Sequence, residues 1–229
     1  GARLIMVDGN FDEALTAVRR LDEEGVAAVV NSINPDRIAG QETGAYEIVD
    51  ALGESPEAVA LPVGNAGNIT AYWAGFVRYA EAGITPSGRR PRMLGFQADG
   101  AAPIVRGAPV EAPETVATAI RIGNPASWAG AEAARDESGG AIEAVSDDEI
   151  LKMQLAVARM EGIFCEPASA AGVAGVARLA REERLHRSEG VVCILTGHGL
   201  KDPDVVTGEE GSLTPVAADL GSIREAMRL

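Results

Sequence analysis

The amino-acid sequence predicts an α/β fold in which a parallel sheet is covered by helices on both faces. Short apolar runs alternate with helical patterns along nearly the whole chain of 229 residues. The runs are continuously apolar, as is typical of parallel strands that are buried on both faces. A helical segment separates most successive runs, and parallel strands need such crossover connections.

Each element follows from its local pattern. Strands are expected over residues 3–7, 27–30, 59–63, 92–98, 140–145 and 190–196, and helices over residues 11–24, 35–52, 68–82, 114–122, 126–137, 148–162 and 166–185. Asn34 followed by Pro35 is a helix N-cap with proline at the first helical position. Ser146 and Glu149 have the spacing of a capping box. The many Ala and Gly residues of 166–179 indicate a helix that packs closely against its neighbour.

Composition narrows the class of function. Hydrophobic residues make up 46% of the chain and the formal net charge is −14, so binding to nucleic acid or to an anionic membrane is disfavoured. The sequence shows no run of 18 apolar residues and no charged-then-apolar leader pattern, so neither a membrane span nor a signal peptide is expected from it. Cys165 and Cys193 lie far apart in apolar runs and are expected to be unpaired thiols in the cytoplasm. No spacing of Cys or His suggests a metal site.

The segment LPVGNAGNIT, residues 61–70, joins an apolar run to a helical pattern through closely spaced glycines. The first amide groups of a helix have no partner within it and attract anions. Gly64 and Gly67 are expected to adopt positive φ and to let a phosphate approach, while Asn65 and Asn68 cap or donate. Neither a Walker lysine nor a G-x-G-x-x-G pattern is present. The loop therefore suits one monophosphate, although a simple strand-to-helix turn would explain it as well.

Several segments, in the same order, resemble the threonine synthase family of fold-type II pyridoxal-phosphate-dependent enzymes, which share the fold of the tryptophan synthase β-subunit. They are NSINPDRIAGQETGAYEI (31–48), PVGNAGNITAYWAGF (62–76), ETVATAIRIGNPASW (114–128), GIFCEPASAAGVAGV (162–176) and LTGHGLKDP (195–203). The resemblance implies that residues 1–33 are the tail of a smaller N-terminal α/β domain. Residues 34–229 would form the larger C-terminal α/β domain with the cofactor-phosphate loop.

The resemblance also assigns site residues. The phosphate of pyridoxal 5'-phosphate would be held by the backbone of Gly64, Asn65, Ala66, Gly67 and Asn68. The hydroxyl of Thr196 would face the pyridine nitrogen and, being neutral, leave that nitrogen largely unprotonated. The phosphate of the substrate, O-phosphohomoserine, would be bound by Asn31, Ser32 and Arg37, although an N-capped surface helix with an exposed arginine would explain these residues equally well.

The segments that resemble the family do not include its catalytic lysine. The chain has two lysines, Lys152 and Lys201, and neither matches the family's Ser-Phe-Lys segment, so the Schiff-base lysine is expected upstream. Lys152 is expected to point to solvent. The implied activity of the complete protein is release of phosphate from O-phosphohomoserine and addition of water to give L-threonine, in a homodimer; residues 1–229 alone are expected to be inactive. Two alternatives stay open: a threonine or serine dehydratase of the same fold, and a non-catalytic binding module.

Overall fold

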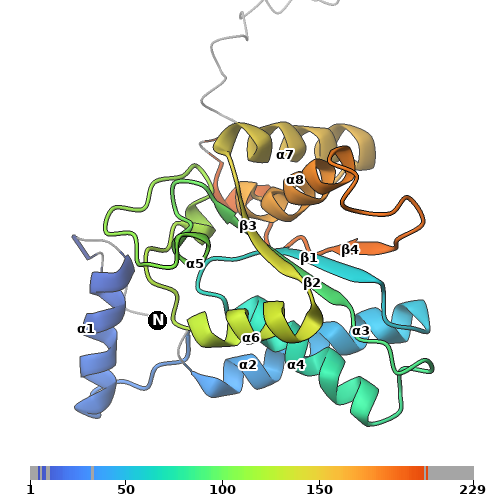
Figure 1. Cartoon of the computed structure of the whole chain (residues 1–229). Coiled ribbons are helices and arrows are strands. Elements are labelled where there is room, and N and C mark those ends of the chain that lie inside the picture. Colours follow the sequence, from blue (N-terminus) through green and yellow to red (C-terminus); the bar gives the residue numbers. More distant parts are fainter. Residues whose placement is uncertain (1–4, 6, 9–10, 32–33, 204, 206–229) are drawn as a thin grey trace, which may run out of the picture.

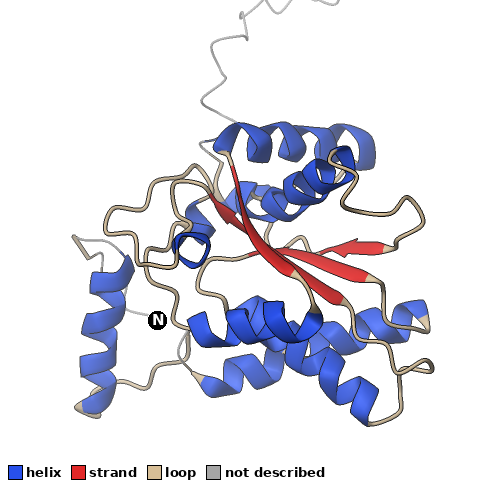
Figure 2. Ribbon diagram, in the orientation of Figure 1, coloured by secondary structure: helices blue, strands red, loops and turns tan. Residues whose placement is uncertain are grey.

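A four-stranded parallel sheet forms the centre of the computed structural model, which describes residues 5, 7–8, 11–31, 34–203 and 205 (Figures 1 and 2). The strands are β1 (Ala58–Pro62), β2 (Arg92–Ala98), β3 (Ala141–Val145) and β4 (Val191–Cys193). Their order is β3-β2-β1-β4, and all three neighbouring pairs are parallel. The predicted α/β fold with a parallel sheet is confirmed.

Helices cover both faces of the sheet (Figure 1). On one face lie α7 (Asp147–Glu161) and α8 (Pro167–Arg181), and on the other lie α3 (Thr43–Leu52), α4 (Gly67–Glu81) and α6 (Trp128–Ser138), with α2 (Pro35–Gln41) beside α4. Each face has its own hydrophobic core, one centred on Phe96 and Ala171, the other on Leu61 and Phe76. The short elements are α5 (Pro103–Arg106), η1 (Thr118–Ile120) and η2 (Gly199–Lys201), while α1 (Phe11–Glu23) stands apart from the sheet.

Both predicted helix starts are confirmed. Asn34 caps α2 by accepting a hydrogen bond from the amide of Asp36 at 2.8 Å. Ser146 and Glu149 form the complete capping box of α7. The helix expected over residues 35–52 is divided at Glu42 into α2 and α3. Helix α4 packs against the break so closely that a Cβ at Gly75 would lie 2.5 Å from the carbonyl oxygen of Glu42.

Helix α8 lies unusually close to the sheet, as its Ala and Gly content predicts. A Cβ at Gly175 would lie 2.0 Å from the ring of Phe96, and one at Gly172 would lie 3.4 Å from the backbone of Leu61. Any larger side chain at Gly175 would displace the helix or the ring. This close packing fixes the position of Glu166, which immediately precedes α8.

Some expected elements are absent or shorter. Residues 27–30 form no strand, because no described strand lies beside them to pair with their backbone, and Val30 is largely exposed. Residues 114–122 form only the short η1, since β-branched side chains are frequent there and the Asp147 carboxylate binds the amide of Val116. Strand β4 ends at Cys193 and is only half-buried, at the edge of the described sheet. The strand expected over residues 3–7 lies largely outside the described residues.

Both cysteines are free thiols, as predicted. Burial raises the pKa of the Cys193 thiol to about 11 and also raises the pKa of Cys165. Both thiols therefore stay protonated and weakly reactive at neutral pH.

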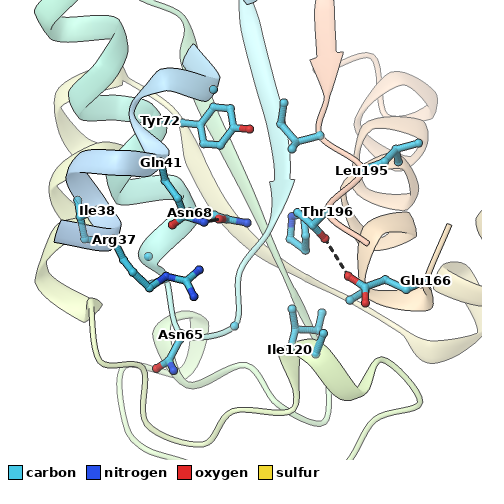
Figure 3. A pocket seen from close by; sticks show the side chains of 18 of the residues that line it. Arg37, Ile38, Gln41, Asn65, Asn68, Tyr72, Ile120, Glu166, Leu195 and Thr196 are labelled. Carbon is cyan, nitrogen blue, oxygen red and sulfur yellow. Dashed lines mark hydrogen bonds between the residues drawn. The ribbon is translucent and has the colours of Figure 1, made fainter. Parts of the chain in front are cut away.

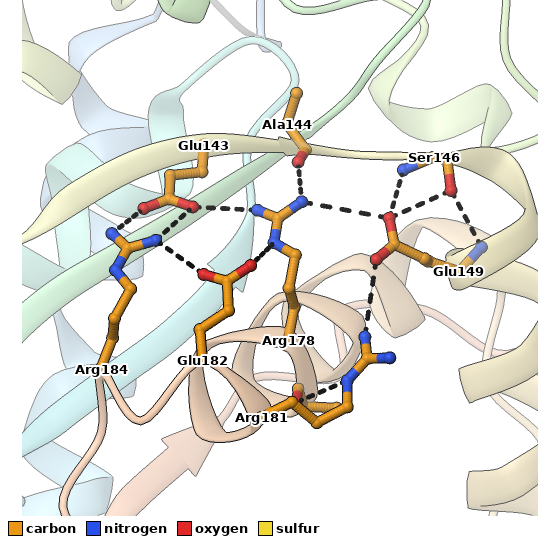
Figure 4. A network of polar contacts seen from close by, with 9 residues as sticks. Glu143, Ala144, Ser146, Glu149, Arg178, Arg181, Glu182 and Arg184 are labelled. Atoms are coloured by element: carbon orange, nitrogen blue, oxygen red, sulfur yellow. Dashed lines mark hydrogen bonds and ion pairs between the residues drawn. The ribbon is translucent and has the colours of Figure 1, made fainter.

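Arginines near the end of α8 and just after it join that helix to β3 and to the start of α7 (Figure 4). Arg178 donates to the carbonyl of Ala144 at 2.6 Å and to the Glu143 carboxylate at 2.9 Å, and lies 4.0 Å from Glu149 of the capping box. Arg184 binds the same Glu143 carboxylate. Burial acts to raise the pKa of Glu143, but Arg184 and Arg178 outweigh it, so this pKa lies below its ordinary value.

We predict that Glu143→Gln lowers the free energy of unfolding of the complete protein by about 1–2 kcal/mol at neutral pH, because charge-assisted bonds from two arginines are weakened. A carboxyl with a lowered folded-state pKa stabilises the protein above its ordinary pKa of 4.5. This stabilisation disappears as pH falls from that value toward the lowered one, so the difference between the two proteins should shrink in acid. Urea unfolding across pH measures it.

Glu182→Gln is the matched control, since Glu182 also pairs with Arg184 but its side chain is 45% exposed. We expect a change of at most about 0.5 kcal/mol for this variant. Equal stability of Glu143→Gln and the parent at neutral pH would contradict the proposed role of the cluster.

Candidate active site

The candidate site lies where β1 and β4 end. Both strands are parallel and paired, with Ala60 opposite Cys193, so the segments that follow them leave the same edge of the sheet. A cavity of about 780 Å³ opens between these segments (Figure 3). Its walls come from Pro62, residues 64–68, 119–120 and 194–196, with side chains from α2, α3, α4, η2 and the start of α8.

The glycine loop after β1, residues 64–68, presents a row of backbone amides to this cavity. Among the described residues, no acceptor is found for the amides of these five residues. Helix α4 begins at Gly67 without a side-chain cap, so its positive end adds to the row. Consecutive free amides at a helix N-terminus are suited to bind a phosphate.

The glycines of the loop act differently from the expectation. Positive φ is found at Ala66, with φ of 65°, and not at Gly64 or Gly67, so that expectation is wrong. Gly64 is needed because a Cβ there would lie 3.0 Å from the Cα of Ile120. At Gly67 a Cβ would make an ordinary contact of 3.4 Å with Ile38.

The asparagines of the loop fix it to its neighbours and do not cap α4. The Oδ1 atom of Asn65 accepts from the amide of Ala126 at 2.8 Å, and its carbonyl accepts from Ser127 at 3.1 Å. The Oδ1 atom of Asn68 accepts from the Gln41 side chain at 2.8 Å. The loop is thus held from α6 and from α2, which leaves its own amides available to a ligand.

Opposite the glycine loop, Thr196 extends from the segment after β4 and is exposed to the cavity (Figure 3). Its hydroxyl donates to Oε1 of Glu166 at 3.1 Å. Glu166 is almost completely buried, and its Oε2 atom has no hydrogen-bond partner among the described residues. The Oε2 atom lies 3.4 Å from Nζ of Lys201, an ion-pair distance without the geometry of a hydrogen bond.

The residues expected to bind a second phosphate lie on the same side of the cavity as the glycine loop. Arg37 is exposed, lines the cavity from α2 and donates to Oδ1 of Asn31 at 3.0 Å. Asn31 also lines the cavity. Ser32 lies outside the described residues.

Sequence reasoning assigned no site role to three residues that line the cavity, Gln41, Tyr72 and Glu166. Gln41 and Tyr72 each lie four residues after a predicted site residue, Arg37 and Asn68, and helical residues at that spacing share a face. That spacing could have identified both. Glu166, at the start of the Ala- and Gly-rich segment, was given no role in the site, because only the folded chain brings its carboxylate to Thr196. Lys152 is exposed on α7, as predicted, and does not line the cavity.

Amides without acceptors at the carboxyl edge of a parallel sheet are typical of the anion sites of α/β enzymes. Residues 1–197 match the family described as pyridoxal-phosphate dependent enzyme, and the chain belongs to this family. The glycine loop fits the cofactor's single phosphate, because its amides have no acceptor among the described residues and line the cavity.

Proteins similar in sequence to this chain include threonine synthases. The chain is 52% identical to threonine synthase of Synechocystis, an alignment that covers 99% of this chain and 59% of that protein. It is 50% identical to threonine synthase of Mycobacterium tuberculosis strain H37Rv, over 100% of this chain and 63% of that protein. The chain therefore spans about three fifths of the length of these curated relatives.

Solved structures support the fold. The processed form of threonine deaminase isoform 2 from Solanum lycopersicum superposes with a TM-score of 0.72 at 21% identity, covering 91% of this chain and 56% of that chain. Maize serine racemase superposes with a TM-score of 0.66 at 22% identity, covering 98% of this chain and 63% of that chain. Among the described helices, none has the length and apolar character needed to cross a membrane.

We predict that Gly64→Ala weakens the binding of pyridoxal phosphate by the complete protein at least about tenfold, which is about 1.4 kcal/mol. The new methyl group would press on the backbone of residues 119–120 and displace the loop. Gly67→Ala is the matched control, because its methyl group meets only ordinary contacts, and its effect should be smaller. Cofactor titration followed by absorbance measures both. Equal losses for the two variants would show that close approach at Gly64 does not shape the loop.

Proposed function

We propose that the chain is part of a threonine synthase, which converts O-phospho-L-homoserine and water into L-threonine and phosphate with pyridoxal 5'-phosphate. One observation carries the proposal: the free amides of the glycine loop and the Arg37 guanidinium line the same cavity. A cofactor and a substrate that each bear a phosphate require two anion sites close together. The threonine synthases at about 50% identity support this assignment.

The two anion sites differ in chemistry. The glycine loop supplies only backbone amides and a helix terminus, which hold an anion without side-chain charge. Arg37 is a cation that can donate paired hydrogen bonds to phosphate oxygens, and its bond to Asn31 orients the guanidinium. The site for the cofactor phosphate would thus be built from the backbone of the glycine loop. The site for the substrate phosphate, which leaves during the reaction, would be built from an exposed side chain.

Bound pyridoxal phosphate supplies an electron sink for the reaction. The chain's own residues would bind the substrate and the cofactor, orient them and enclose them. Ile120 and Ile194 form an apolar part of the cavity wall, which would limit access of water to the reacting carbons. In the complete reaction, the γ-carbon exchanges its bond to the phosphate oxygen for a bond to hydrogen, and the β-carbon exchanges one hydrogen for the hydroxyl of a water molecule. The hydrogen lost from the β-carbon and the second hydrogen of the water balance the hydrogen gained by the γ-carbon and the proton that leaves with the phosphate. Arg37 would neutralise the phosphate as it leaves.

The lysine that binds the cofactor covalently would lie outside residues 1–229. Lys152 is exposed and remote from the cavity lining, and Lys201 lies beside the Glu166 carboxylate at the wall opposite the glycine loop. We also propose that residues 1–33 belong to a smaller domain, of which α1 is one helix, and that the complete protein is a homodimer.

A dehydratase for threonine or serine is the second candidate, because the solved structures with this fold include a threonine deaminase. Such an enzyme has no substrate phosphate to bind. The position of Arg37 and Asn31 at the cavity favours the synthase. The complete protein supplied with O-phosphohomoserine should release threonine and phosphate in equal amounts. Formation of a 2-oxo acid and ammonia from threonine or serine, without that activity, would support the dehydratase, and neither activity would support a binding module.

We predict that Arg37→Ala in the complete protein lowers kcat/KM for O-phosphohomoserine by roughly ten- to a hundredfold, because a charge-assisted phosphate contact is worth about 1.5–3 kcal/mol. The absorbance of the bound cofactor should stay the same. Arg159→Ala removes an exposed arginine from α7, away from the cavity, and serves as the control. Unchanged kinetics of Arg37→Ala would show that Arg37 is only a surface residue.

A further inference from the structure

The side chains of Gln41 and Asn68 meet between the helix that carries Arg37 and the glycine loop (Figure 3). We propose that Gln41 is a positioning residue that links the two anion sites. Through Asn68 it holds α2, and with it Arg37, at a fixed place relative to the cofactor phosphate. The inference rests on the proposed binding of a cofactor phosphate and a substrate phosphate in one cavity. It deepens that proposal, because it names the residue that connects the two sites.

Gln41 is the last residue of α2 and lies four residues after Arg37, so both side chains share one face of the helix and line the cavity. The Nε2 atom of Gln41 donates to Oδ1 of Asn68 at 2.8 Å, and both side chains are half-buried. Among the described residues, no other side-chain hydrogen bond joins α2 to the glycine loop.

The position of α2 depends on such contacts more than on burial. The helix has seven residues and none of them is buried, so it is too short and too exposed to be stable by itself. At its start, Asn34 donates to the carbonyl of Val29 at 2.8 Å. Beside the loop, Ile38 would make an ordinary contact of 3.4 Å with a Cβ at Gly67. The bond from Gln41 is thus the polar contact that holds the end of α2 to the loop.

Asn68 belongs to both parts of the link. Its backbone amide is one of those in the glycine loop that have no acceptor in the described part of the chain, while its side chain accepts from Gln41. A phosphate bound by the loop amides would immobilise Asn68 and, through Gln41, the end of α2. Arg37 would then be in place before a second phosphate arrives, so less conformational freedom is lost on binding.

The two hydrogen bonds around Arg37 have different tasks. The bond from its guanidinium to Oδ1 of Asn31, at 3.0 Å, orients the guanidinium, but Asn31 precedes α2 and does not tie the helix to the loop. The bond from Gln41 sets where the helix lies. Loss of Gln41 should therefore weaken the binding of the second phosphate without removing the charge that binds it, and only while Arg37 is present.

The test is a double-mutant cycle in the complete protein loaded with pyridoxal phosphate. Calorimetry gives the Kd of inorganic phosphate, and initial rates give kcat and KM for O-phosphohomoserine, for the parent, Gln41→Leu, Arg37→Ala and the double variant. We expect Gln41→Leu to raise the phosphate Kd and the KM at least about fivefold, with a much smaller change in kcat. Added to Arg37→Ala, it should have no further effect, because it acts through Arg37.

Ser138→Ala is the matched control for a merely structural effect. Ser138 also joins two elements, since its hydroxyl accepts from the amide of Met93 in β2 at 3.0 Å, and it does not line the cavity. This variant should unfold at a lower urea concentration than the parent, while its phosphate Kd stays the same.

A phosphate Kd of Gln41→Leu equal to that of the parent, or additive effects of Gln41→Leu and Arg37→Ala, would overturn the inference. A parent protein that binds phosphate through Arg37 but forms no threonine would instead refute the proposed function, and the phosphate Kd values would still decide the role of Gln41. If Gln41→Leu does not fold, Gln41→Asn takes its place, because its amide is one methylene too short to reach Asn68.

Discussion

The parallel pairing of β1 with β4 determines the site. These strands are far apart in the sequence, yet their register places the glycine loop and Thr196 at one edge of the sheet. A shift of that register by one residue would turn the side chains of β4 to the opposite face and separate the two walls of the cavity. The hydrophobic cores on both faces, one under α8 and one under α4, oppose such a shift. The chemistry of the site thus depends on packing some distance from it.

The close packing of α8 against the sheet also determines where residues of the site lie. Because Gly172 and Gly175 let the helix lie against Leu61 and Phe96, its first turn reaches the segment after β4. There Ser169 binds two consecutive amides, and Glu166 lies behind Thr196. Small residues in the middle of the helix therefore position polar residues at its start. Arg178 near its other end binds β3, so both ends of α8 are fixed.

Local patterns were sufficient for the fold and for the phosphate loop. Largely apolar runs identified β1, β2 and β3, although β3 contains Glu143, and capping residues identified the starts of α2 and α7. These features depend only on neighbouring residues. The conformation inside the loop was not predictable in this way. Gly64 is required by contact with Ile120, which is distant in sequence. Positive φ falls on Ala66, between Asn65 and Asn68, whose partners also come from distant segments. The partners of Glu166 likewise arise only when α8 and β4 meet.

The amides of the glycine loop have a consequence for the lifetime of the protein. These amides have no acceptor among the described residues, and a bound phosphate would supply acceptors for them in the folded chain only. A ligand that binds only the folded chain shifts the folding equilibrium in proportion to its free concentration. Scarcity of the cofactor would then leave more chains unfolded and open to proteolysis. The abundance of the protein in the cell would follow the supply of its own cofactor, without any dedicated regulator.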